Sequence, residues 1–189
     1  MPALAPKQGS REWHALRAGR ITASLAAACL GLDPYVSRQK AFRTIVGTEP
    51  LYDNAAMAWG RMHEAKARLD YEVATGELVS VTGFWVHPEK DWLGASPDGL
   101  VGADGLVEIK CPGSLPDKVP VHHHIQMLVQ LACTGRDWCD YWAWTPTGTF
   151  VRRTRRQGIA GLLHRLEAFY LTYVVPGVEP PRKKRRAKR

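Results

Sequence analysis

The patterning of the sequence changes at Gly76, and this change limits the folds that the chain can adopt. Before Gly76, alanine-rich and amphipathic stretches that follow capping residues predict helices. After it, short runs rich in valine, phenylalanine and tryptophan are divided by glycine, proline and aspartate, which is typical of strands. Helices that precede a sheet, with one helix inserted between strands, predict an α/β or α+β fold with a mixed central sheet flanked by helices.

The expected elements follow from this periodicity and from its punctuation. Helices are predicted after Ser10 and over residues 22–30, 37–46, 55–75, 121–133 and 159–174. Strands are predicted over residues 78–86, 93–100, 106–109, 138–144 and 149–153. The length of 189 residues and the hydrophobic content of 45% suit one domain over residues 1–179, with N-terminal helices at 10–75 and a catalytic sheet with its helices at 78–175.

The remaining residues, 180–189, form a basic tail that we expect to be disordered. The tail contains seven of the 26 basic residues and no acid, so the rest of the chain has 19 basic against 18 acidic residues. Because that part is almost neutral, any attraction to phosphate there must come from local arrangement rather than from bulk charge. The tail either solubilises the protein or tethers it to DNA, and the sequence leaves both roles open.

The chain carries none of the signals that direct a protein into or across a membrane. It has no run of about 18 apolar residues, as a membrane span needs, and residues 1–10 lack the apolar core of a signal peptide. The four cysteines contain no C-x-x-C pair, which argues against a zinc ribbon or a disulfide framework. We therefore expect reduced thiols, no membrane partner and a cytoplasmic location.

Three residues in the middle of the chain carry the candidate chemistry. Asp98 lies at the turn in which one expected strand ends, and the next strand delivers Glu108-x-Lys110. Because residues two apart in a strand face the same side, Glu108 and Lys110 project together while Ile109 points into the core. Two adjacent strands can therefore bring Asp98 and Glu108 to one cation.

A hard divalent cation suits this arrangement. Mg²⁺ takes oxygen ligands and keeps several waters, so two carboxylates, a backbone carbonyl and solvent suffice. A charged lysine does not bind the ion, but it can hold and polarise an attacking water or offset charge that builds on a phosphate. The combination of Pro97-Asp98 with Glu108-x-Lys110 is similar to the signature of PD-(D/E)xK nucleases and predicts phosphodiester hydrolysis.

Five ordered blocks within residues 10–146 resemble the lambda exonuclease or YqaJ-type recombinase family of alkaline exonucleases. They read Trp13-x-x-x-Arg17-x-Gly19-x-Ile21-Thr22-Ala23-Ser24, Trp59-Gly60-x-x-x-Glu64, Ser96-Pro97-Asp98-Gly99, Glu108-Ile109-Lys110-Cys111-Pro112 and His124-x-Gln126. The resemblance implies a restriction-endonuclease-like core and a phage-derived 5′ to 3′ exonuclease acting on the ends of linear double-stranded DNA. It also implies release of mononucleotides, a 3′ overhang for a single-strand annealing protein, and a homotrimeric ring.

The resemblance assigns the metal ligands residue by residue. Asp98, Glu108 and the carbonyl of Ile109 would hold one Mg²⁺, and Glu64 would serve a second ion, directly or through water. Two ions roughly 4 Å apart would then clamp the attacking and the leaving oxygen. We expect Mn²⁺ to substitute for Mg²⁺.

The same resemblance assigns the remaining site residues. Lys110 would orient the nucleophilic water, and Gln126 would line the site from the following helix. Arg17, Ser24 and Ser96 match positions that hold the terminal 5′-phosphate, which suits a charged fork and two hydroxyl donors.

The chain departs from the family pattern at two places. Leu128 stands where family members often carry a second glutamine, and Gly113-Ser114-Leu115-Pro116 stands where a basic residue usually follows. Lys118 is a candidate replacement for that basic residue. Both departures concern the capture of phosphate rather than the metal site.

Other residues have simpler interpretations, and other functions stay open. Trp13 and Trp59 are expected in the core, Cys111 as a buried thiol, and the histidines 122–124 at a helix entry rather than as a metal site. The alternative function is a structure- or sequence-specific endonuclease with the same metal core, such as a restriction enzyme or a junction resolvase. A catalytically idle DNA-binding scaffold is supported only by the basic tail.

Overall fold

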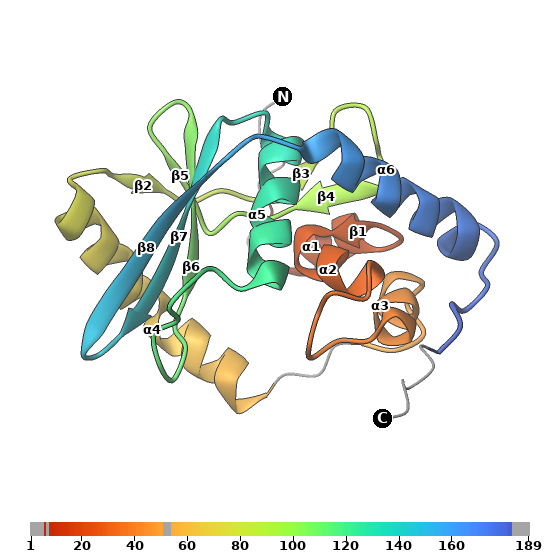
Figure 1. The fold of residues 1–189 in the computed structure, drawn as a ribbon, viewed down its shortest axis with the longest axis horizontal. Helices are drawn as coiled ribbons and strands as arrows, with labels where there is room; N and C mark the ends of the chain where they lie inside the picture. The colour runs from red at the N-terminus through yellow and green to blue at the C-terminus, as the bar shows by residue number, and fades with distance from the viewer. Residues whose placement is uncertain (1–5, 7, 51–53, 183–189) are drawn as a thin grey trace, which may run out of the picture.

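The computed structural model describes residues 6, 8–50 and 54–182 (Figure 1). Its helices are α1 (Arg11–Arg17), α2 (Ala23–Cys29), α3 (Arg38–Ile45), α4 (Ala55–Thr75), α5 (Val121–Thr134) and α6 (Ile159–Phe169), and α6 continues as a π-helix, η1 (Tyr170–Val174). Its strands are β1 (Ile21–Thr22), β2 (Val79–Ser80), β3 (Trp85–Val86), β4 (Leu93–Ala95), β5 (Gly99–Val101), β6 (Gly105–Lys110), β7 (Trp138–Thr145) and β8 (Gly148–Arg155). The described strands form a large sheet in the order β2-β5-β6-β7-β8 and a small sheet in the order β1-β4-β3.

The helices begin and end where the sequence predicts. The side chains of Ser10, Ser37 and Asn54 accept hydrogen bonds from backbone N–H groups at the starts of α1, α3 and α4. Gly76 and Gly135 end α4 and α5 in the left-handed conformation, each with a φ of 73°, which glycine adopts without steric cost. The predicted helices over residues 37–46, 55–75 and 121–133 are therefore confirmed.

The large sheet is mixed, as predicted, and α4 and α5 lie on its opposite faces (Figure 1). Strands β6 and β7 run parallel, and α5 is the crossover helix between them. Alternation along β6 sends Leu106 towards Met127 and Leu131 of α5. It sends Ile109 towards Ala67 of α4, in the core position that the sequence predicts.

The small sheet lies beyond α5 and packs with α2, α3 and α6 around a second apolar core (Figure 1). The predictions of single strands over residues 78–86 and 93–100 are wrong, because each segment breaks in the middle and its halves join different sheets. Strands β2 and β5 pair in the large sheet, whereas β3 and β4 pair in the small one. Pro97 cannot donate to a ladder and Gly83 weakens a strand, so both segments cross between the sheets at these residues.

Two tryptophans predicted in the core have different environments. Trp13 is buried. Trp59, on the N-terminal half of α4, is 40% exposed, so the prediction that it lies in the core is wrong. Its ring packs against His63 one turn later, with 3.8 Å between the ring centroids, and this contact within α4 takes the place of a core site.

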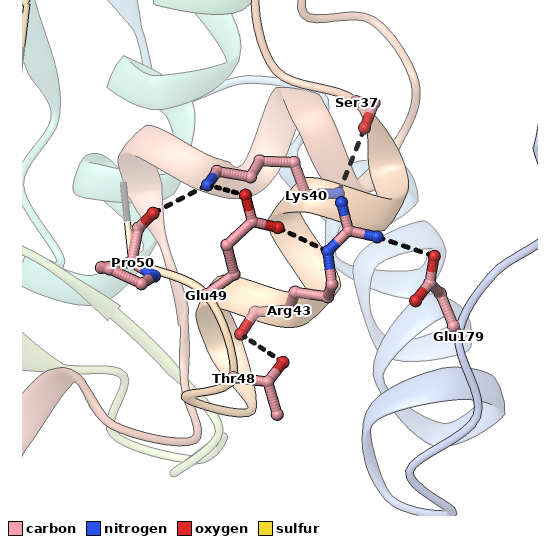
Figure 2. Close-up of polar contacts among 7 residues, drawn as sticks. All are labelled: Ser37, Lys40, Arg43, Thr48, Glu49, Pro50 and Glu179. Carbon is pink, nitrogen blue, oxygen red and sulfur yellow. Dashed lines mark hydrogen bonds and ion pairs between the residues drawn. The ribbon is translucent and has the colours of Figure 1, made fainter. Parts of the chain in front are cut away.

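Ion pairs attach the C-terminal segment to α3 (Figure 2). Both carboxylate oxygens of Glu49 are bonded, one to Lys40 Nζ and the other to Arg43 Nε. Arg43 also donates through Nη1 to Glu179 at 2.9 Å, and Lys40 donates to the carbonyl of Pro50 at 2.7 Å. These contacts join α3, the loop after it and the segment after η1.

The ordered structure continues to the start of the basic segment. Gln39 Nε2 donates to the carbonyl of Pro180 at 3.0 Å, and Pro180 is buried although the sequence places it in the tail. Residues 183–189 of the predicted tail lie outside the described residues. None of the described helices has both the length and the apolar content needed to cross a membrane.

Candidate active site

The carboxylate of Glu108 has no exposed surface, and three donors surround it. Gln126 Nε2 donates to Oε1 at 2.6 Å, and Gln130 Nε2 donates to Oε2. Lys110 Nζ forms an ion pair with Oε1. A buried carboxylate is tolerated only when it is paired and hydrogen-bonded, so these three side chains make the position of Glu108 possible.

The local sequence explains how these donors come together. Glu108 and Lys110 project from the same face of β6, as the alternation predicts. Gln126 and Gln130 are four residues apart on α5 and therefore share one face of the helix. Met127 and Leu131 pack onto the sheet beside them and hold that face towards Glu108.

Gln130 is a site residue that sequence reasoning missed. It is fully buried, and besides its bond to Glu108 its amide oxygen lies 3.8 Å from Cys139 Sγ. The signal in the sequence is its place four residues after Gln126 in the predicted helix, which puts both glutamines on one face. Gln130 supplies the second amide that Leu128 does not.

Asp98 lies between β4 and β5 and is bonded to the backbone of β6. Its Oδ2 accepts a hydrogen bond from the N–H of Ile109 at 2.7 Å. Burial raises the pKa of Asp98 well above its ordinary value, and the negative charge of Glu108 raises it further. The structure thus brings the two predicted carboxylates together in a place where their repulsion favours a proton or a cation.

Lys110 keeps its positive charge in this setting. Burial alone would lower the pKa of Lys110, but the negative charges of Glu108 and Asp98 outweigh burial and raise it above its ordinary value. A charged ammonium cannot serve as a general base. It can hold a water or a phosphate oxygen beside the carboxylates.

Glu64 lies on α4 close enough for its charge to raise the pKa of Asp98. Its own side chain, however, accepts a hydrogen bond from Arg68 Nη2 at 2.9 Å. Gly60, one turn earlier, faces open space where a side chain would otherwise stand. The structure therefore places Glu64 beside the site with its carboxylate turned to Arg68.

The residues of this site supply only some of the ligands that a divalent cation needs. Within the described ranges, no group of three or more histidine, cysteine, aspartate or glutamate side chains is spaced to hold an ion. Asp98, Glu108 and the carbonyl of Ile109 supply two carboxylates and one carbonyl, and water completes such a shell for Mg²⁺. The raised pKa of Asp98 is the observation that favours a cation here.

Arg17 and Ser96 are joined through Trp13. The guanidinium of Arg17 lies 4.0 Å from the centre of the Trp13 ring, and Trp13 Nε1 donates to Ser96 Oγ at 3.0 Å. No described carboxylate pairs with Arg17, and burial lowers its pKa to about 10. A half-buried cation without a counter-ion is suited to an anion from outside.

Ser24 reaches the same end of the small sheet. Strands β1 and β4 run parallel, and Thr22 lies opposite Gly94. Ser24, in the first turn of α2, and Ser96, just after β4, each follow that pair by two residues, so both lie just beyond the same end of the small sheet. The Ser24 hydroxyl is exposed and bonds to the Thr22 hydroxyl at 3.2 Å.

Gly94 is required by close packing at this end. A Cβ atom built on Gly94 would lie 2.3 Å from Cζ of Phe84, a side chain with no exposed surface. The missing side chain lets β4 lie directly on that ring. The chain then continues through Ser96 and Pro97 to Asp98, which places the serine and the carboxylate two residues apart.

Cys111 and the histidines at the start of α5 do not enter the donor set. Cys111 is half-buried rather than buried, and burial raises the pKa of its thiol to about 11, so it is not a thiolate nucleophile. His123 Nδ1 lies 3.1 Å from the hydroxyl of Tyr141. Burial, together with the charge of Lys110, lowers the pKa of His123 to about 2, so its ring is neutral.

Comparison with known proteins agrees with this geometry. Residues 12–137 match the model of the YqaJ-like viral recombinase domain. The chain belongs to this family. A search of curated protein sequences gave no match.

Solved structures of exonucleases share the fold. The chain is 35% identical to an alkaline exonuclease, LHK-Exo, from Laribacter hongkongensis, with a TM-score of 0.76 over 90% of this chain and 95% of that one. The same enzyme in complex with dAMP gives a TM-score of 0.77 at the same identity and coverage. A phage-related exonuclease from Haemophilus somnus 129PT shares only 13% identity, over 87% of this chain and 99% of that one, and its TM-score of 0.64 shows a common fold. The predicted family and fold class are confirmed.

Replacement of Gln130 by leucine should weaken metal binding. The change leaves Oε2 of Glu108 without its donor, and loss of a partner that orients a metal ligand typically lowers affinity about 10–100-fold. Titration with Mn²⁺ in the absence of DNA measures the effect. Thr134→Val, which removes another α5 side-chain bond that does not involve Glu108, is the matched control and should bind Mn²⁺ normally. Wild-type affinity in a folded Gln130→Leu protein would contradict this role.

Mn²⁺ should stabilise the protein more strongly as the pH rises. The raised pKa of Asp98 means that the metal-free protein keeps a proton there to a higher pH than the unfolded chain does. The stability that this proton contributes is complete below about pH 4, the ordinary pKa of Asp, and is lost as the pH rises through the raised pKa. A bound metal displaces that proton and removes the loss. The shift in Tm caused by Mn²⁺ should therefore grow with pH. Asp98→Asn should abolish this growth and exposed Asp104→Asn should preserve it; a pH-independent shift in wild type would count against the assignment.

Proposed function

We propose that the protein is a Mg²⁺-dependent exonuclease that degrades linear double-stranded DNA from its 5′ ends. Family membership and 35% identity to an alkaline exonuclease make it a deoxyribonuclease. The observation that carries the finer proposal is the short connection between two sites. Ser96 shares the Trp13 bridge with the unpaired Arg17, and Asp98, two residues later, faces Glu108.

Asp98, Glu108 and the carbonyl of Ile109 would hold the first ion. Their chemistry fits a hard cation, and the raised pKa of Asp98 supports this because a cation relieves the repulsion of the two carboxylates. When bound, Mg²⁺ or Mn²⁺ supplies a Lewis acid and lowers the pKa of its water. Glu64 would serve the second ion through water, since Arg68 holds its carboxylate.

The remaining residues of the site act on the water and on Glu108. Lys110, charged and bonded to Glu108, would hold the attacking water and stabilise the negative charge that develops on the phosphate. Gln126 would hold Oε1 of Glu108 at the entrance of the site. Gln130 would hold Oε2 from the interior, so that the carboxylate keeps one orientation during the reaction.

Arg17, Ser24 and Ser96 would bind the terminal 5′-phosphate. A guanidinium donates to phosphate as a fork, and the two serine hydroxyls complete the donor set. An anchored 5′-phosphate beside the carboxylates accounts for digestion in the 5′ to 3′ direction, one nucleotide at a time. The deoxynucleoside monophosphate found with the Laribacter enzyme agrees with mononucleotide release.

The proposal extends to assembly and context. Met62, Leu69 and Val73 lie on α4 with 75%, 54% and 78% of their surfaces exposed, and this apolar surface supports association of several copies into the ring that family resemblance suggests. The 3′ overhang left by digestion would pass to a single-strand annealing protein. The four cysteines are free, in agreement with a cytoplasmic location in a bacterial or phage-infected cell.

Linear and closed DNA distinguish this function from an endonuclease. In Mg²⁺ the protein should degrade linear duplex and release label from 5′-labelled ends before 3′-labelled ends, while covalently closed circles survive. Lys110→Ala should lower the rate by at least about 100-fold, as expected for loss of a group that stabilises charge in the transition state, and should still bind DNA. Cleavage of closed circles would favour the endonuclease alternative, and earlier release of 3′ label would reverse the polarity.

Arg17 should determine the preference for phosphorylated ends. Arg17→Ala should lower the rate on 5′-phosphorylated duplex about 10–100-fold, because a charge-assisted hydrogen bond is lost, and should change the rate on 5′-hydroxyl duplex little. Rates on the two substrates at equal ionic strength measure the effect. The exposed Arg11→Ala variant of the same helix is the charge-matched control. Equal losses on both substrates would show that Arg17 does not contact the end.

A further inference from the structure

We propose that a basic groove between α5 and β8 binds the backbone of the single DNA strand that digestion leaves intact. The groove has a volume of about 520 Å³ and lies outside the Asp98–Glu108 site. Lys118, Arg152 and Arg155 are among its lining residues, and no carboxylate side chain of the described residues lines it. The choice of DNA as the polyanion rests on the proposed function.

The positive charge of the groove is not neutralised within the described chain. Asp140 engages Arg153 through both carboxylate oxygens, at 2.8 and 2.9 Å, so that arginine is occupied. Lys118 and Arg152 are exposed, and neither forms an ion pair with any described side chain. Because the chain before residue 180 is almost neutral, this local excess of charge is a distinct feature of the surface.

The register of β8 directs Arg152 into the groove. Phe150 and Thr154 lie two residues before and two residues after Arg152, and both face α5. Thr154 Oγ1 lies 3.3 Å from His124 Nδ1, and Phe150 packs on the core below α5. Alternation therefore points Arg152 to the same side. Burial lowers the pKa of His124, so the histidine contributes a neutral ring.

The groove is close to the candidate active site and separate from it. Arg152 lies opposite Tyr141 of β7, and Tyr141 lies opposite Glu108 of β6. Two strand spacings of about 4.8 Å place the Arg152 and Glu108 backbones roughly 10 Å apart. Gln126 turns to Glu108, whereas His124 and Leu128 line the groove from the other flank of α5. A strand of a few nucleotides spans this distance at about 3.4 Å per nucleotide or more.

The lining chemistry favours a single strand over other polyanions. A groove that tracks phosphates needs spaced cations and neutral donors, and Lys118, Arg152 and Gln157 provide them from different segments. Duplex DNA carries two phosphate backbones separated by a major groove about 12 Å wide, and a cavity of about 520 Å³ does not hold both. Charge on an edge strand also prevents sheet-to-sheet pairing, but that purpose requires no concave site.

Salt-dependent binding without metal tests the groove. The ligand is an oligothymidylate of about 20 nucleotides, longer than the roughly 4–16 nucleotides of a typical single-strand site, titrated in EDTA at several salt concentrations. Arg152→Gln and Lys118→Gln should each weaken binding several-fold. Each should also reduce the slope of log affinity against log salt by about 0.7, the value for one lost phosphate contact on single strands. Arg165→Gln, which removes one exposed arginine from α6, is the charge-matched control and should leave the slope unchanged.

Several outcomes would overturn the proposal. If Arg152→Gln and Arg165→Gln weaken oligothymidylate binding equally, the attraction is one of general charge. If neither Arg152→Gln nor Lys118→Gln weakens binding, the groove does not bind the strand. If the two groove variants bind poly-glutamate more weakly but oligothymidylate normally, the groove binds an acidic protein. If they lose affinity for blunt duplex equally, the groove binds duplex. If the wild-type protein does not degrade linear duplex while Arg152→Gln and Lys118→Gln still weaken binding as expected, the result would contradict the proposed function alone.

Discussion

A carboxylate without exposed surface, that of Glu108, determines how α5 packs on the large sheet. An unpaired charge in that position would cost about 3–5 kcal/mol, so the fold must bring donors to it. Gln126, Gln130 and Lys110 are these donors, and two of them come from α5. The crossover helix between the parallel strands is therefore held by polar bonds as well as by its apolar contacts, and the bonds to Glu108 specify its rotation.

The two parts of the candidate site belong to different sheets. The carboxylates that we propose as metal ligands lie with the large sheet, and the residues that would hold a DNA end lie with α1, α2 and the small sheet. The chain passes from one to the other through Ser96, Pro97 and Asp98. Trp13 adds a second connection within the end-binding part, because its ring contacts Arg17 on one side and Ser96 on the other. In the proposed function, this short segment would link recognition of the DNA end to hydrolysis.

The sequence predicted most of the elements and the centre of the site, since both follow from local periodicity. Glu108 and Lys110 share a face because strands alternate, and the helix caps and terminating glycines act within a few residues. Pairing partners are not local. The segments 78–86 and 93–100 have strand-like composition throughout, and nothing in their sequence shows that their halves join different sheets. The contact of Gln130 with Glu108 is also not local, because it depends on how α5 is rotated against β6, and the two residues are 22 apart in the sequence.

The division of the site between two sheets also bears on how such proteins diversify. In the proposed function, changes in α1, β1 and α2 would alter which DNA end is accepted while the carboxylates of the large sheet keep their positions. Protein engineers could use the same boundary to graft an end-binding layer from one relative onto the hydrolytic layer of another. The packing of Phe84 beneath Gly94 would be the contact to preserve at the junction, since even one added carbon does not fit there.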